Sequence, residues 1–213
     1  MISTSLRAPT VDTEVNFWPG IIDMLTSLLM FFMLIYFVQH NINPTSLATE
    51  IARQKQQRFD AVFESEFASE IRSGAIVLKP DVNLLQITFG EGILFESGHY
   101  ALQPRGAALL RRLAAVIHRL DATSQSRLYD QIQIEGHTDS TAMSRSTYPR
   151  DNWELSTARA LAVLRFLSER CDPALDERQL SANGYAHTRP AHKQRSRNRR
   201  IEIRIYFSGL DTR

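Results

Sequence analysis

The chain has 213 residues, enough for one ordinary domain and an attached segment. Hydrophobic residues make up 43% and charged residues 23%, a mixture that excludes a disordered chain. The formal net charge of +2 gives no strong electrostatic case for nucleic-acid binding. Cys171 is the only cysteine, so the fold cannot depend on an internal disulfide. We expect a buried, unreactive thiol there, the alternative being a cross-link between two copies.

A short tail at residues 1–16 precedes an apolar segment at residues 17–38. At the rise of an α-helix this segment spans roughly 33 Å, enough to cross the hydrocarbon core of a bilayer. Trp18 and Tyr36 suit the two membrane interfaces. The alternative is a cleaved signal peptide, against which the apolar run is too long and no small-residue cleavage motif follows Val38. The segment is therefore predicted to be a transmembrane helix.

Asp23 is the only carboxylate in this segment. A charged group inside lipid costs about 3 kcal/mol or more unless it is neutral, paired or facing water, so Asp23 is suited to taking up and releasing protons. Thr26 and Ser27 share its helix face and can hydrogen-bond along an ion path. One helix cannot form a pore, so this interpretation requires a partner membrane protein. The alternative is that Asp23 lies at the headgroup level as a helix-start residue.

Residues 39–74 are predicted to be a loop followed by a linker helix that ends near Gly74. Its apolar residues recur at helical spacing, namely Leu47, Ile51, Phe59, Val62, Phe63, Phe67 and Ile71. Two interpretations stay open. The helix either packs on its own domain, or forms a spacer, paired with a second copy, that lifts the domain from the membrane.

From residue 75 to residue 213 strands alternate with helices. Strands are predicted at 75–79, 84–89, 131–135, 179–185 and 200–207, and helices at 104–120 and 152–169. Such alternation favours helices layered on one sheet. The fold class is therefore a single N-terminal transmembrane helix plus an α+β domain, a β-α-β-α-β-β sandwich.

This region carries five sequence motifs in order: LFESGHYALQPRG at 94–106, GHTDS at 136–140, NWELSTARALAV at 152–163, GYAHTRP at 184–190 and RSRNRRIEIRI at 195–205. Together they resemble the OmpA-like peptidoglycan-binding domain, from about residue 84 to residue 207. Two features look more like the MotB branch of that family than like outer-membrane porins. They are the long loop between Asp139 and Asn152 and the sequence NWELS at 152–156.

A peptidoglycan stem peptide carries an ammonium and a carboxylate on one carbon of its cross-linking residue. Asp139, after a strand, supplies an acceptor for the first, and Arg159, on the following helix, supplies a bidentate fork for the second. The resemblance implies that these positions hold diaminopimelate. It also implies that the rest of the pocket is formed by Thr138, Asn152, Leu155, Asn198 and Arg199. The alternative is a purely structural Asp–Arg salt bridge.

The apolar segment carries a second resemblance. DMLTSLLMFFMLI at 23–35 is similar to the ion-carrying helix of MotB, and NFWPGIIDML at 16–25 resembles ZorB, the MotB-like subunit of Zorya anti-phage systems. Flagellar MotB chains usually begin with a basic tail, which residues 1–16 do not resemble. These likenesses favour a Zorya-type subunit. The alternatives are a flagellar stator subunit, a passive envelope tether, or a periplasmic binding module with a signal peptide.

The resemblance also implies a location and partners. We expect a bacterial inner-membrane protein with a cytoplasmic N-terminus and a periplasmic C-terminal domain, although the charges that flank the span do not favour this orientation. Two copies would be surrounded by five copies of a ZorA-like or MotA-like multi-span protein, with both Asp23 side chains inside the ring. Whether protons or sodium ions are carried stays open.

Other functions receive little support. The basic run at residues 193–200 lacks interleaved aromatic residues, which disfavours a nucleic-acid surface. The spacing of the histidines predicts no metal site; they include His99, His118, His137, His187 and His192. Neither a nucleophile–base pair nor a phosphate-binding loop is visible, so we expect no enzyme, no metal and no cofactor.

Overall fold

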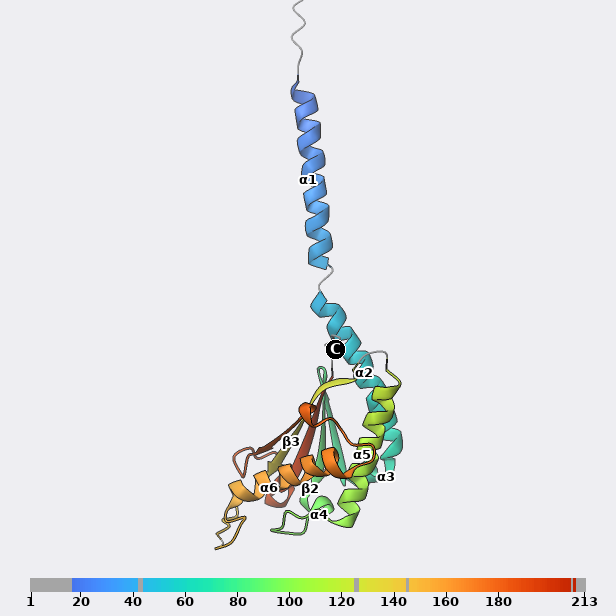
Figure 1. The fold of residues 1–213 in the computed structure, drawn as a ribbon. Helices are drawn as coiled ribbons and strands as arrows, with labels where there is room; N and C mark the ends of the chain where they lie inside the picture. The colour runs from blue at the N-terminus through green and yellow to red at the C-terminus, as the bar shows by residue number, and fades with distance from the viewer. Residues whose placement is uncertain (1–16, 42–43, 125–126, 145, 208, 210–213) are drawn as a thin grey trace, which may run out of the picture. The chain divides into compact units, whose positions relative to one another are not determined.

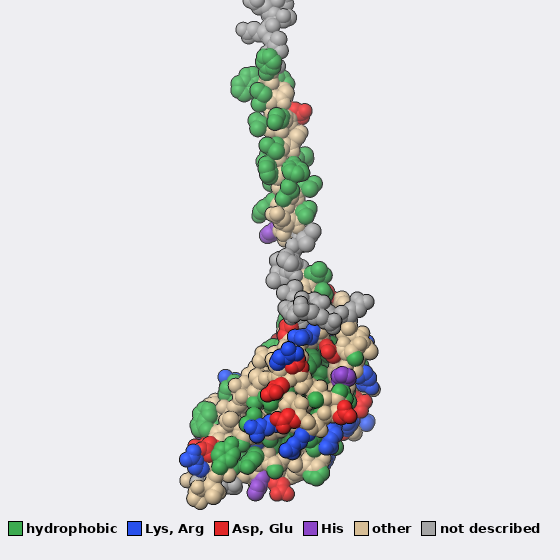
Figure 2. Space-filling model, viewed as in Figure 1, with side chains coloured by type: hydrophobic (Ala, Val, Ile, Leu, Met, Phe, Trp, Pro, Cys, Tyr) green, Lys and Arg blue, Asp and Glu red, His purple; other side chains and the backbone are tan. Residues whose placement is uncertain are grey.

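The computed structural model describes residues 17–41, 44–124, 127–144, 146–207 and 209. The chain divides into two compact units, residues 1–44 and residues 45–213. The first contains the predicted apolar helix as α1 (Trp18–Asn41), of which Trp18–His40 is long and apolar enough to cross a membrane. Figure 2 shows this helix covered with hydrophobic side chains. The predicted tail at residues 1–16 lies outside the described residues.

The second unit is an α+β domain, as predicted, with helices lying against a five-stranded sheet (Figure 1). Its elements in chain order are α2 (Pro44–Glu66), α3 (Ala68–Arg72), β1 (Ile76–Asp81), β2 (Leu84–Gly90), α4 (Glu91–Leu94), α5 (Pro104–Ala122), β3 (Tyr129–His137), α6 (Asn152–Arg165), β4 (Leu180–Gly184) and β5 (Arg200–Phe207). The predicted helix at 152–169 is divided, because a π-helical turn (Phe166–Arg170) follows α6.

The strands are ordered β1-β2-β5-β3-β4. Only β3 and β4 are parallel, since α6 crosses over between them, and every other neighbouring pair is antiparallel. The register aligns Ile87, Ile203 and Ile134 across three strands, and all three side chains are fully buried in the hydrophobic core. The opposite face of the same strands is polar, where Thr88, Glu202 and Glu135 are aligned.

Helix α2 is part of the domain. Its residues Phe59 and Phe63, and Phe67 directly after it, are fully buried in the same core as the sheet. The three rings stack in series, with centroids 5.8 Å and 4.3 Å apart, and Phe59 also packs edge-on against Phe207 of β5 at 5.7 Å. Of the two interpretations of the linker helix, this packing favours the helix that packs on its own domain. The structural boundary thus falls at Thr45, whereas the sequence placed it at residue 75.

Two glycines let α6 lie directly on β3 and β4. A Cβ atom at Gly136 would lie 2.1 Å from the carbonyl oxygen of Ser156, and one at Gly184 would lie 2.2 Å from Oγ1 of Thr157. Any larger residue would push the helix off the sheet. These glycines begin two of the motifs noted in the sequence, and they fix where the side chains of α6 stand.

Candidate functional site

Six of the seven residues predicted to form the binding site line one pocket of about 270 Å³, named here the Asp139 pocket. Asp139 follows the end of β3, while Asn152, Leu155 and Arg159 come from successive turns of α6. The Asp139 pocket therefore opens where a strand ends and a helix begins. Its lining residues are Glu91, Ser97, Gly98, Thr138, Asp139, Thr141, Ala142, Met143, Asn152, Leu155, Arg159 and Arg199.

The Asp139 carboxylate is buried and oriented by two neighbours. Its Oδ1 accepts a hydrogen bond from the backbone N–H of Thr141 at 3.0 Å, and its Oδ2 accepts one from Nη1 of Arg199 at 2.7 Å. Burial opposes ionisation, but these hydrogen bonds outweigh it and hold the pKa of Asp139 below its ordinary value. Asp139 is therefore a preformed negative group at neutral pH.

Arg159 is almost completely buried and does not pair with Asp139. Its Nη2 donates to the carboxylate of Glu91, and its Nε donates to the carbonyl oxygen of His99 at 2.8 Å. Its guanidinium also lies over the ring of Phe95, 5.3 Å from the centroid. The alternative of a structural Asp139–Arg159 salt bridge is therefore not what the structure has, since Asp139 pairs with Arg199 and Arg159 pairs with Glu91.

Glu91 joins these two pairs into one network. Its Oε2 accepts from Nε of Arg199 at 2.5 Å, and its backbone N–H donates to the carbonyl oxygen of Arg199 at 2.9 Å. Two carboxylates and two guanidiniums therefore meet at the Asp139 pocket with no net charge. Arg199 is the more accessible arginine, with a side chain 37% exposed against 2% for Arg159. A balanced set of this kind suits a zwitterion, whose two charges can each meet an opposite partner.

Thr138 adds an unused polar atom to the wall. The residue is 3% exposed, and its Oγ1 has no hydrogen-bond partner within the described part of the chain. A buried hydroxyl without a partner costs free energy, which a bound polar ligand would recover. Asn152 has a different role, since its Nδ2 donates to the carbonyl oxygen of Thr141 at 2.8 Å and so ties the loop to α6.

Asn198 is the one predicted residue that does not line the Asp139 pocket. Its Oδ1 accepts from the backbone N–H groups of Ala191 and His192, each at 2.9 Å, and its Nδ2 donates to the carbonyl oxygen of His192. Asn198 therefore braces the segment that carries Arg199. It is a positioning residue and not a wall of the pocket.

Sequence reasoning missed Glu91, although this residue holds both arginines. The sequence did contain an indication of its role. Glu91 lies between the end of an apolar strand and the apolar residues Leu94 and Phe95, where a charged side chain is expected only if it is paired. The short helix α4 that carries Glu91 was not predicted either.

In α1, the hydroxyl of Thr26 donates to the backbone carbonyl of Asp23 at 2.9 Å. The predicted neighbours on one helix face are therefore close, as helical spacing requires. The contact is to the backbone of Asp23 and leaves the role of its carboxylate a prediction.

The polar face of the sheet holds a possible metal-ligand group, which the spacing of the histidines did not predict. One ligand atom each of Glu135, His137 and Glu202, all buried, lies within 4.8 Å of the others. The carboxylate of Glu202 already accepts from Nε of Arg200 at 2.6 Å and from Nη2 of Arg204 at 3.0 Å. Two guanidiniums thus already balance these carboxylates, so the chemistry of the group fits an ion network better than a metal site.

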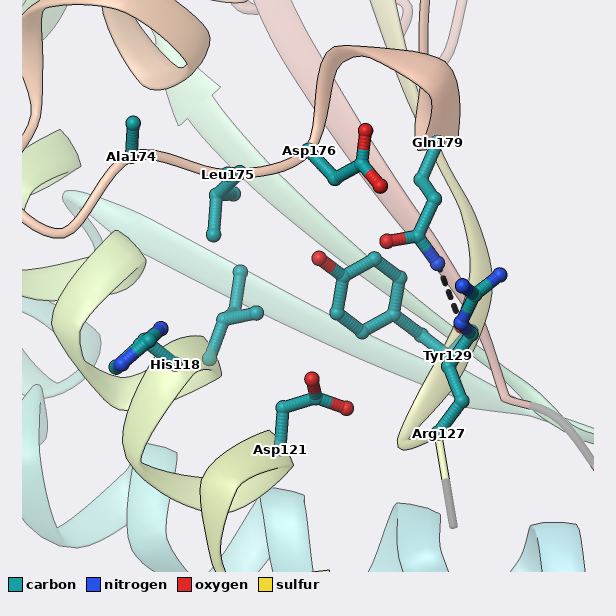
Figure 3. A pocket seen from close by; sticks show the side chains of 9 residues that line it. His118, Asp121, Arg127, Tyr129, Ala174, Leu175, Asp176 and Gln179 are labelled. Carbon is teal, nitrogen blue, oxygen red and sulfur yellow. Dashed lines mark hydrogen bonds between the residues drawn. The ribbon is translucent and has the colours of Figure 1, made fainter. Parts of the chain in front are cut away.

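A further hollow of about 250 Å³ lies around Tyr129, at the start of β3 (Figure 3). It is roughly 30 Å along that strand from the Asp139 pocket. Burial, together with Asp121 and Asp176, raises the pKa of Tyr129 to about 12, which keeps its hydroxyl protonated. Gln179 donates to the carbonyl oxygen of Tyr129 at 3.1 Å (Figure 3). None of the predicted site residues lies there.

Comparison with known proteins agrees with the fold. The model of the OmpA family matches residues 94–204, more than half of the chain, which therefore belongs to the OmpA family. YtxE of Bacillus subtilis, an uncharacterised protein, is 32% identical over 132 residues, covering 60% of this chain and 50% of YtxE. The chain thus spans about half the length of this curated relative.

Two solved structures share the fold. A MotB-like protein from Desulfovibrio vulgaris has a TM-score of 0.63 and 25% identity, covering 76% of this chain and 99% of that one. The cell wall anchor of the type VI secretion system from Pseudomonas aeruginosa has a TM-score of 0.56 and 26% identity, covering 68% of this chain and 96% of that one. The protein therefore has an OmpA-family domain that resembles MotB-like proteins in structure, and one apolar helix precedes this domain.

Proposed function

We propose that this chain is the peptidoglycan-binding subunit of an ion-driven inner-membrane complex, of the Zorya anti-phage type. In this role the protein performs no catalysis. The domain holds the cell wall while the membrane helix exchanges an ion with a partner. The observation that carries the proposal is the charge-balanced Asp139 pocket on a chain that also has an isolated carboxylate in an apolar helix.

The Asp139 pocket supports wall binding in three ways. Asp139 is ionised and can accept from an ammonium group, and Arg199 is half-exposed beside it and can bind a carboxylate. Thr138 lines the same pocket, and its buried hydroxyl has no hydrogen-bond partner among the residues that the structure describes. These groups match the zwitterionic centre of diaminopimelate, the cross-linking residue of many stem peptides. The cell wall anchor with the same fold is consistent with this ligand.

Helix α1 supports coupling to an ion gradient. Asp23 is the one carboxylate in a helix long enough to cross a membrane, and such a group is tolerated where it can be protonated or face water. A membrane potential supplies roughly 2.3 kcal/mol per charge per 100 mV. The proposal places the N-terminus in the cytoplasm, the domain in the periplasm, and five copies of a ZorA-like or MotA-like protein around two copies of this chain.

The first experiment tests wall binding by the full-length chain. Purified sacculi are incubated with the detergent-solubilised protein and sedimented. We expect the unaltered chain to sediment with the sacculi and Asp139→Asn to remain in solution. Arg119→Gln, an exposed arginine of α5 outside the pocket lining, is the matched control and should sediment normally. Equal sedimentation of all three proteins would refute the proposed ligand.

The second experiment separates defence from motility. The resemblance of residues 16–25 to ZorB favours phage defence, whereas the MotB-like structural neighbour favours a flagellar stator as the second candidate. We expect phage protection to be lost on deletion of the gene for the multi-span partner, with swimming unchanged. Loss of swimming with unchanged protection would select the flagellar alternative. If Asp23→Asn changes neither, the chain is a passive tether.

A further inference from the structure

A second pocket shares a wall with the Asp139 pocket. It has a volume of about 510 Å³, against about 270 Å³ for its neighbour, and Glu91 and Arg199 line both. It lies between the β1–β2 hairpin and the segment from residue 191 to residue 200, and we name it the Lys79 pocket. A ligand held by Arg199 in one pocket is therefore at the edge of the other.

The Lys79 pocket carries uncompensated positive charge. Glu91 is its one acid, and this carboxylate is already bound by Arg159 and Arg199. Lys79, on β1, and Arg197, in the segment before β5, both line the pocket. Across the described residues neither has an ion-pair partner. An anionic group is thus the ligand that this pocket suits.

The remaining lining is small and partly apolar. Val77 is 44% exposed on β1, and Ala75 and Ala191 present methyl groups beside three glycines. The hydroxyl of Thr88 adds a short polar contact. The Lys79 pocket therefore suits a compact segment of chain with a carboxylate and small side chains, and is poorly suited to a large aromatic group.

We infer that the Lys79 pocket is a second stem-peptide subsite, which holds the free α-carboxylate of the glutamate residue next to diaminopimelate. This inference rests on the proposed function, because it assumes diaminopimelate in the Asp139 pocket. The free zwitterionic carbon of diaminopimelate is joined to the α-carbon of the γ-linked glutamate through nine covalent bonds, which span roughly 11 Å when extended. The glutamate can therefore reach a neighbouring pocket that shares a wall with the Asp139 pocket. Lys79 and Arg197 would bind its carboxylate, and the small walls would accept the methyl group of the preceding alanine.

The test uses two ligands that differ in one group. Isothermal titration of the full-length chain in detergent micelles compares N-acetyl-alanyl-γ-glutamyl-diaminopimelate with the same tripeptide amidated at the glutamate α-carboxyl. We expect amidation to weaken binding to the unaltered chain about tenfold. The variant Lys79→Gln/Arg197→Gln should bind both tripeptides with the same, weaker affinity, whereas the matched control Arg119→Gln should keep the tenfold difference.

Two results would overturn the inference. One is equal affinity of the unaltered chain for the two tripeptides, which needs no variant and so does not depend on the folding of one. The other is a tenfold difference that persists in Lys79→Gln/Arg197→Gln. Failure of the proposed function is distinguishable, because the unaltered chain would then bind neither tripeptide and would not sediment with sacculi.

Discussion

At the scale of single residues, Glu91 connects the parts of the Asp139 pocket. Its carboxylate is bound by Arg159 on one side and by Arg199 on the other, and the residue is buried. Removing one partner of a buried ion pair leaves a charge without compensation in a region of low dielectric constant. The arrangement of Arg159 and Arg199 therefore depends on Glu91.

We predict that Glu91→Gln lowers the stability of the domain by about 3 kcal/mol, because the buried Arg159 keeps its charge and loses its carboxylate. Thermal unfolding of the full-length chain in micelles measures this effect, and sacculus sedimentation should fall in parallel. The control is Glu154→Gln, which breaks the exposed pair with Arg150 and should change little. Equal melting temperatures for Glu91→Gln and the unaltered chain would contradict the prediction.

Most of the site could be predicted because its residues lie in short motifs whose chemistry is local. Asp139 and Arg159 were assigned from their residue types and from the resemblance of their motifs to OmpA-like domains, and both line the pocket. The ion pairs that these residues form were not predicted, since Arg159 pairs with Glu91, which lies 68 residues before it and reaches it only through the fold. Local sequence patterns do not predict which charged residues pair when they lie far apart in the chain.

At the scale of elements, the position of α6 on the sheet determines the geometry of the Asp139 pocket. The contact is possible because Gly136 and Gly184 have no side chain where the helix backbone passes. Three of the lining residues stand on that helix, so a shift of α6 moves them together.

We predict that Gly136→Ala destabilises the domain and abolishes sacculus binding, because the added Cβ would lie 2.1 Å from a backbone oxygen of α6 that cannot move alone. Gly92→Ala is the matched control for stability, since no atom lies within 4 Å of its added Cβ. Circular dichroism melting separates the two variants. A normal melting temperature for Gly136→Ala would show that the helix can retreat at little cost.

Helix α2 carries a carboxylate that opposes folding at neutral pH. Burial, and secondarily Glu64, raises the pKa of Asp60 to about 6, and its Oδ1 is buried without a hydrogen-bond partner among the residues described. Between about pH 4 and pH 6 the folded state then binds more protons than the unfolded state. Stability should therefore fall as the pH rises through this window and stay lower above it.

We predict that Asp60→Asn raises stability by roughly 1 kcal/mol at pH 7.5, a value reduced for the partial exposure of the group, and changes nothing at pH 4. Melting temperatures of the full-length chain at the two pH values test this. Asp130→Asn replaces an exposed carboxylate and should have little effect at either pH. The same gain for Asp60→Asn at both pH values would exclude titration as the cause.

Element types were predicted well because their periodicity is local. The last strand was placed at 200–207, as it is found, where isoleucines alternate with charged residues. The division of the helix at 152–169 by a π-helical turn was not predicted. The docking of α2 on its own domain was one of two interpretations that the sequence left open. An amphipathic pattern shows that a helix has an apolar face, but it does not identify the surface that buries that face.

At the scale of the whole molecule, two compact units carry two separable tasks in the proposed function. We predict that Asp23→Asn abolishes phage protection and leaves sacculus sedimentation intact, whereas Asp139→Asn abolishes sedimentation and leaves membrane insertion intact. Plaque counts, sedimentation and membrane fractionation of the same strains measure these outcomes. Loss of sedimentation in Asp23→Asn would mean that the two units depend on one another.

The stacked phenylalanines of α2 limit how this protein can extend. Peeling the helix from the domain would expose Phe59, Phe63 and Phe67 to water, at about 2 kcal/mol for each side chain. The total of roughly 6 kcal/mol is comparable to the entire stability of an ordinary domain. Helix α2 is therefore expected to stay packed on the domain under tension, unless another surface buries the three rings.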